Sequence, residues 1–94
     1  MQDLITRWKR AAQRADEEQV RVVLVGTEYR AASSSSRLRS YRLFPTPDGW
    51  ACECKANHEY GMPCKHLWAL AEALKLDPIS EISVPGLDEE QLVA

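Results

Sequence analysis

Long apolar runs are absent from this sequence. Nowhere do its 94 residues approach the roughly 18 consecutive apolar residues that a membrane-spanning helix requires. The first seven residues also lack the apolar core of a secretory signal peptide. These absences predict an intracellular protein, cytoplasmic or nuclear, that has no membrane partner.

Basic charge is scarce for a dedicated nucleic-acid binder. The formal net charge is −2 and the sequence pI is near 5.6. Residues 1–50 hold nine Lys and Arg against six Asp and Glu, whereas residues 51–94 hold three against eight. Any contact with nucleic acid must therefore come from a local basic patch.

Cysteine is also rare, and its placement is informative. The chain has three cysteines, all between positions 52 and 64. An odd number in one short segment is unlike the disulfide framework of a secreted domain, so metal ligation is the better interpretation. A single domain of this length has marginal stability, and a structural metal would help to hold it.

The N-terminal residues 1–18 show the spacing of an amphipathic helix. Apolar side chains recur one, three and four positions apart, which puts them on one helix face: Leu4, Ile5, Trp8, Ala11, Ala12 and Ala15. Basic residues occupy the rest of the surface: Arg7, Lys9, Arg10 and Arg14. An ordinary solvated face is the favoured interpretation of these charges, and a helix that faces DNA is the alternative.

Short β-branched and aromatic runs predict strands in the middle of the chain. The expected strands are Val20–Val25, its hairpin partner Tyr29–Ser33, a third strand Arg37–Phe44 and a short extended segment Trp50–Cys54. Turns are expected at Ser33–Ser36 and at Pro45–Gly49. An apolar repeat then predicts a helix from about Lys65 to Leu76, which Asp77-Pro78 ends.

Two closely spaced pairs of residues form the candidate metal site. Cys52 and Cys54 flank one residue of an extended segment, so both side chains leave the same face. Cys64 and His66 cannot both lie in mid-helix and converge, because positions two apart differ by roughly 200° around the axis. They must straddle the helix start after Pro63. Three thiolates and one imidazole are a donor set for tetrahedral zinc.

Other interpretations of these residues remain open at this point. His58 also lies between the cysteines and is the alternative fourth ligand. The thiols could be buried free cysteines, Cys52 and Cys54 could form a strained disulfide, or Cys64 could be a nucleophile with a histidine as base. His66 is favoured because structural zinc sites usually take their ligands in close pairs from two rigid elements.

The expected result is a small α+β domain that holds one structural Zn²⁺. It has an N-terminal amphipathic helix over residues 1–18, then a zinc-binding domain over 19–77 with a small antiparallel sheet of three to four strands and a zinc-capped C-terminal helix. An acidic, partly ordered tail follows over 78–94. Four protein ligands leave no open position on the metal, so we expect neither enzymatic activity nor a small-molecule substrate.

The pattern C-x-C, nine residues, C-x-H resembles the SWIM zinc finger family. The resemblance covers roughly Val20 to Leu76 and depends on Ser40–Leu43, Trp50–Cys54 and Gly61–Leu67. It implies a strand-strand-helix zinc fold with Cys52, Cys54, Cys64 and His66 as ligands. SWIM modules occur in Mutator-type transposases, chromatin-remodelling ATPases and recombination factors, where their presumed task is binding DNA or other proteins.

Two functional hypotheses follow. The first is nucleic-acid binding, because four arginines lie between Glu28 and Asp48 with no acidic residue among them: Arg30, Arg37, Arg39 and Arg42. The second is a protein-interaction adaptor, because apolar residues outside the site could be covered by a partner: Trp68, Ile79, Ile82 and Val84.

Overall fold

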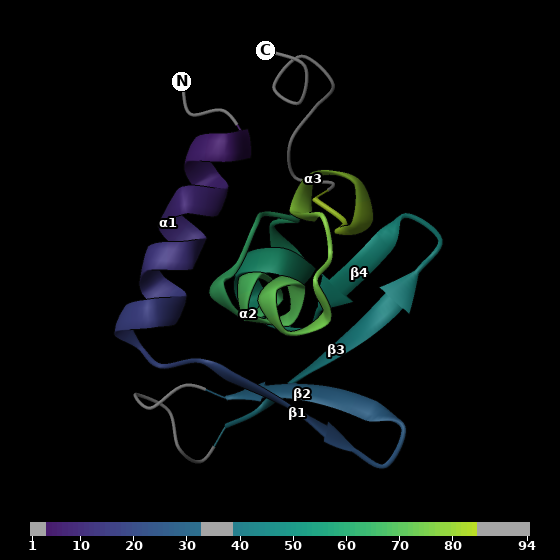
Figure 1. The fold of residues 1–94 in the computed structure, drawn as a ribbon. Coiled ribbons are helices and arrows are strands. Elements are labelled where there is room, and N and C mark those ends of the chain that lie inside the picture. Colours follow the sequence, from purple (N-terminus) through teal and green to yellow (C-terminus); the bar gives the residue numbers. More distant parts are fainter. Residues whose placement is uncertain (1–3, 33–38, 85–94) are drawn as a thin grey trace.

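The computed structural model describes residues 4–32 and 39–84, and these confirm an α+β fold with a four-stranded antiparallel sheet (Figure 1). The strands follow one another in the order β1-β2-β3-β4. The elements in chain order are α1 (Leu4–Glu17), β1 (Arg21–Val25), β2 (Glu28–Ala32), β3 (Tyr41–Thr46), β4 (Gly49–Cys52), the helical turn η1 (Lys55–Glu59), α2 (Lys65–Leu74) and α3 (Pro78–Glu81).

The molecule is layered, with α2 packed between α1 and the sheet (Figure 1). Helix α1 buries one stripe of side chains at the predicted helical spacing: Leu4, Trp8, Ala11 and Ala15. The Trp8 ring lies 6.2 Å from the ring of Trp68 on α2, between centroids. In the described part of the chain, α1 therefore packs mainly on α2.

The core lies between α2 and one face of the sheet. Leu67 and Leu70 of α2 are completely buried, and they pack in one apolar cluster with Ala31, Leu43 and Cys52 of the sheet. Alternation along the strands places Arg30 and Arg42 on the opposite face, where they are cross-strand partners. Cys52, the first of the predicted metal ligands, thus lies at the inner face of the sheet, against α2.

The third strand lies further along the chain than the sequence predicts. The expected strand Arg37–Phe44 is β3, Tyr41–Thr46, and Arg39 and Ser40 precede it without strand structure. Residues 37 and 38 and the predicted turn Ser33–Ser36 lie outside the described residues. The strand expected to form a hairpin with β1 is confirmed. It is β2, which ends at Ala32.

Pro45 belongs to β3 and not to the following turn. It pairs with Trp50 of β4, whereas the pairing of β3 with β2 ends at Leu43. Its missing N–H therefore removes no hydrogen bond to β2. Thr46 closes the turn instead, since its hydroxyl donates to the Gly49 carbonyl at 2.6 Å and accepts from the Asp48 N–H at 3.2 Å.

The described part of the predicted tail, residues 78–84, packs onto β4. Asp77 caps α3 by accepting a hydrogen bond from the Ile79 N–H at 3.0 Å. Ile82, only 4% exposed, forms a parallel bridge with Trp50, and Val84 is also buried. The rest of the predicted tail, residues 85–94, lies outside the described residues. In residues 4–32 and 39–84, no helix is long and apolar enough to cross a bilayer.

Candidate metal centre

The structure brings the four predicted ligands together from two chain segments. The sulfur atoms of Cys52, Cys54 and Cys64 and a ring nitrogen of His66 all lie within 4.8 Å of one another, and all four residues are buried. Tetrahedral zinc with Zn–S bonds of about 2.3 Å places its ligand atoms about 3.8 Å apart. The Cys52 sulfur and the His66 Nδ1 are 3.7 Å apart. The donor set and its spacing fit one structural zinc ion.

The end of β4 delivers the first pair. Cys52 is the last residue of β4 and pairs with Leu43 in the sheet. Cys54 is still extended, with φ −68° and ψ 160°, and it caps the turn η1. Glu53 between them is exposed, as expected when alternate residues of an extended segment point to opposite sides. The rigid sheet therefore fixes the position of the first two sulfurs.

The start of α2 delivers the second pair. Cys64 is extended and precedes the helix, and its sulfur accepts a hydrogen bond from the Leu67 N–H at 3.4 Å. His66 lies in the first turn, so the pair straddles the helix start as predicted. The His66 ring packs against Tyr41, with 4.7 Å between centroids, and this contact orients the imidazole. His58, the alternative ligand, is exposed on η1 and lies outside the cluster.

Asn57 is a supporting residue that sequence reasoning missed. Its side chain is buried and accepts a hydrogen bond from the Cys52 N–H at 2.8 Å. Its Nδ2 donates to the carbonyl oxygens of Met62 at 3.1 Å and Ser83 at 3.0 Å. One side chain thus joins the strand with the first ligands, the loop before the second pair and the segment after α3. Within an unpatterned loop, an asparagine gives no sequence signal for this role.

The three thiols cannot all ionise without a cation. Burial, and after it hydrogen bonds with the other two thiols, raises the pKa of Cys64. A hydrogen bond with Cys54 raises the pKa of Cys52 to about 12. Hydrogen bonds from these two thiols lower the pKa of Cys54, because a single thiolate accepts from both. A divalent cation at the centre would stabilise all three thiolates together.

Comparison with known families identifies the segment around this site. The family model of the SWIM zinc finger matches residues 46–75. Residues 46–75 are similar to a SWIM zinc finger. The match spans β4, η1 and α2, including all four clustered residues, whereas α1 and the β1-β2 hairpin lie outside it. A search of curated proteins and a search of solved structures found no match to the chain.

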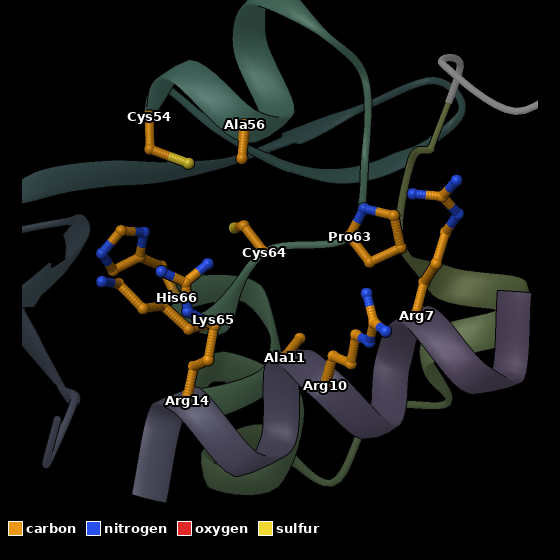
Figure 2. Close-up of a pocket in the computed structure, with 10 residues that line it drawn as sticks. All are labelled: Arg7, Arg10, Ala11, Arg14, Cys54, Ala56, Pro63, Cys64, Lys65 and His66. Carbon is orange, nitrogen blue, oxygen red and sulfur yellow. The ribbon is translucent and has the colours of Figure 1, made fainter. Parts of the chain in front are cut away.

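A groove runs between the SWIM finger and α1, with a volume of about 350 Å³. Figure 2 shows the side chains of Arg7, Arg10 and Arg14 extending from α1 toward the loop that carries Pro63 and Cys64. Lys65 lines the same groove and forms an ion pair with Glu18. Glu18 also lies 3.8 Å from Arg14. The stripe of α1 that the sequence assigned to solvent therefore borders the metal centre.

Two of the four arginines predicted to contact nucleic acid, Arg30 and Arg42, lie on the open face of the sheet, outside the groove beside α1. Arg30 and Arg42 share one carboxylate, Glu28, at 2.9 Å and 3.7 Å. Arg30 also donates to the Ser40 hydroxyl, and the Arg42 guanidinium lies over the Phe44 ring at 5.2 Å. Arg39 is exposed, and Arg37 lies outside the described residues. The structure thus brings together two of the four, with their charge partly neutralised.

Proposed function

We propose that this chain is a SWIM module that binds nucleic acid through the groove between α1 and the zinc finger, with one structural zinc holding the fold. The observation that carries the proposal is the stripe of Arg7, Arg10 and Arg14 along that groove. Their spacing of three and four residues aligns three guanidinium groups on one helix face. Arginine is suited to this task because its planar fork binds phosphate oxygens in pairs.

The charges in the groove leave a positive surplus. A zinc ion with three thiolates and a neutral imidazole carries about −1, and Glu18 adds one more negative charge. Against these stand the three arginines and Lys65. In the described part of the chain, Arg7 and Arg10 have no acidic partner, and Arg10 is exposed whereas Arg7 is half-buried. These two residues are therefore the arginines of the groove whose charge no carboxylate of the described residues offsets.

The strand arginines have a smaller part in this proposal. Arg30 and Arg42 already pair with Glu28, so a phosphate would have to compete with that carboxylate. Arg39 is exposed and can still add a peripheral contact. The overall acidic balance, with a pI near 5.6, means that binding depends on the local groove and weakens with salt.

Salt-dependent affinity tests the groove directly. We would titrate the zinc-loaded protein against duplex and single-stranded DNA across a salt series. For duplex DNA, each lost phosphate contact lowers the slope of log K against log salt by about 0.9. We expect the double variant Arg7→Ala/Arg10→Ala to lower both the affinity and the slope.

The matched control is Arg21→Ala, which removes an exposed arginine of β1 that lies outside this groove. The pair Arg30→Ala and Arg42→Ala tests the open sheet face separately. Zinc stoichiometry and circular dichroism would verify that every variant is folded. Absence of binding at low salt, or a slope that the Arg7→Ala/Arg10→Ala change leaves intact, would remove the proposal.

A protein partner is the second candidate, and one surface favours it. Ile5 and Ile79 are 58% and 52% exposed and line an apolar groove with Trp8 and Trp68. Ile82 and Val84, which the sequence also suggested for partner binding, are buried in the chain's own core. If the module were an adaptor, Ile5→Glu and Ile79→Glu would remove co-purifying proteins and leave DNA affinity unchanged.

A catalytic role is not part of the proposal. Four protein ligands complete a tetrahedral zinc site, so no position remains for a water or a small-molecule substrate. The three thiols must also stay reduced to bind the metal, which suits an intracellular, reducing compartment.

A further inference from the structure

Strand β1 forms one edge of the sheet and exposes a run of apolar side chains. It pairs with β2 on one side only. Its last three residues, Val23, Leu24 and Val25, are 55%, 58% and 55% exposed. Single exposed apolar residues are common on protein surfaces, but three in succession on an edge strand are a template for another strand.

The backbone of β1 is ready for such pairing. The β1-β2 hairpin closes at the pair Val25 and Glu28 with a two-residue turn. In an antiparallel pair, hydrogen-bonded and non-bonded positions alternate. Counting back from the turn, Val22 and Leu24 direct their N–H and C=O groups to the free edge. Outside the sheet ladder, no backbone hydrogen bond of the described residues involves either of them.

The usual devices that protect a sheet edge are missing from β1. The strand Arg21–Val25 contains no proline and no lysine, and its five pairs with β2 run without a bulge. Its single charged residue, Arg21, lies at one end. Natural proteins normally guard such an edge with charges, proline, bulges or a covering element. An unguarded apolar edge is a surface on which another strand can pair.

We propose that β1 pairs antiparallel with β1 of a second copy of this chain, around a two-fold axis at Val23. This register is self-complementary, because Val22 faces Leu24 of the other copy and Val23 faces its own equivalent. Val22 and Leu24 both direct their backbone N–H and C=O groups to the free edge. The backbone hydrogen bonds of the sheet can therefore continue from one copy to the other. The two Arg21 side chains lie about 14 Å apart along the strand direction, which is beyond the Debye length at physiological salt.

A groove lies beside β1 on the side where Val22 would meet Leu24 of the second copy. Val22 lies opposite Ala31, and Leu24 lies opposite Tyr29, which pairs with the buried Leu43. Residues directly opposite one another share a sheet face, so Val22 and Leu24 lie on the helix side. On that side, a groove between α1, α2 and β1 has a mixed lining, with apolar Val20, Val22, Ala69 and Ala73 beside the charged Asp16 and Glu72. The pairing brings Leu24 of the second copy next to Val22 at this groove.

Oligomeric state tests the proposal, and it does so without nucleic acid and independently of the proposed function. Sedimentation and light scattering of the zinc-loaded full chain would give its mass from about 1 to about 500 µM. The monomer is 10.7 kDa, and we expect a concentration-dependent dimer of twice that mass. Leu24→Lys should shift the protein to the monomer. Ile5→Lys is the matched control, since Ile5 is equally exposed at 58% but lies on α1.

Mixing two charge variants tests the register. Val23→Lys and Val23→Glu should each be monomeric, because like charges would face each other at the two-fold axis. Their mixture should recover the dimer, because lysine then faces glutamate. Zinc stoichiometry verifies the fold of each variant. A wild-type monomer at every concentration, a dimer that survives Leu24→Lys, or a mixture that stays monomeric would each overturn the proposal.

Discussion

The buried amide of Asn57 accepts a hydrogen bond from the backbone N–H of Cys52, with 2.8 Å between nitrogen and oxygen. Cys52 also contributes the sulfur that lies 3.7 Å from the His66 ring nitrogen. Asn57 is not a ligand, but it therefore supports the metal centre by holding the backbone of one ligand, Cys52. Outer contacts of this kind fix the orientation of metal ligands.

Removing the Asn57 side chain should weaken both the fold and the site. Asn57→Ala leaves one buried N–H and two carbonyl oxygens without their partner, and an unsatisfied buried group costs about 1–3 kcal/mol. We expect a loss of about 3 kcal/mol in unfolding free energy and a zinc affinity lower by about 10- to 100-fold. Denaturant titration and competition with a chelating dye would measure the two effects. His58→Ala, the exposed neighbour on η1, is the control, and equal effects of both changes would contradict this role.

Zinc removal should unfold the domain. Structural zinc contributes about 10–16 kcal/mol in small fingers, which equals or exceeds the whole stability of a typical domain. A chelator should abolish the near-ultraviolet circular dichroism signal of the packed tryptophans and expose all three thiols to alkylation. Added zinc should restore the signal and the protection. An unchanged spectrum in a protein shown to be metal-free would contradict a structural role for the ion.

Local patterns in the sequence predicted most of the secondary structure and the paired cysteines. The apolar stripe of α1 and the β-branched run of β1 both depend on residues that are close in the chain. The same holds for the C-x-C and C-x-H pairs, whose spacing determines whether two side chains can converge. The helix boundary between Cys64 and His66 followed from helix geometry together with Pro63 and the apolar repeat after it.

Features that depend on distant contacts could not be predicted. Pro45 can continue β3 because the pairing of β3 with β2 ends at Leu43. Only the strand register shows this. Ile82 is buried because Trp50, far away in sequence, offers an edge for a bridge. The α1 arginines became candidates only when the fold placed α1 beside the zinc finger. Each case depends on tertiary packing, which no local window of sequence contains.

The two histidines should differ sharply in their effect on the metal. His66→Ala removes a buried donor from the cluster, whereas His58→Ala removes an exposed ring outside it. Cobalt substituted for zinc would report the geometry, since tetrahedral sites absorb visible light far more strongly than octahedral ones. We expect the tetrahedral spectrum to persist in His58→Ala and to weaken or shift in His66→Ala. The opposite pattern would reassign the fourth ligand.

Zinc affinity should rise with pH because the metal must displace protons. Because zinc removal is expected to unfold the domain, the three metal-free thiols have the ordinary pKa of cysteine, which lies above neutral pH. Zinc binds only thiolates, so binding below that pKa releases about three protons and the affinity rises about 1,000-fold per pH unit. Calorimetry at pH 7.5 in buffers of different ionisation enthalpy would count the protons. A count near zero would contradict the proposed ionisation states.

Gly49 should be more sensitive to substitution than Gly26, because the end of α3 packs closely against it. Its φ is +120°, and an added Cβ would lie 2.7 Å from the Glu81 carbonyl oxygen. Gly26 has a φ of +65° but no atom within 4 Å of the same position, so it shows the backbone cost alone. We expect Gly26→Ala to cost about 1 kcal/mol through its left-handed backbone and Gly49→Ala about 3 kcal/mol, since it adds a clash with main chain.

Hydrogen exchange would locate the damage from Gly49→Ala. The Ser83 N–H donates to the Trp50 carbonyl at 2.8 Å, and this bond lies beside the clash. We therefore expect the Ser83 amide to lose its protection in Gly49→Ala and to keep it in Gly26→Ala, both at saturating zinc. If both variants protected this amide equally, the close approach of Gly49 to Glu81 would not be what holds the segment against β4.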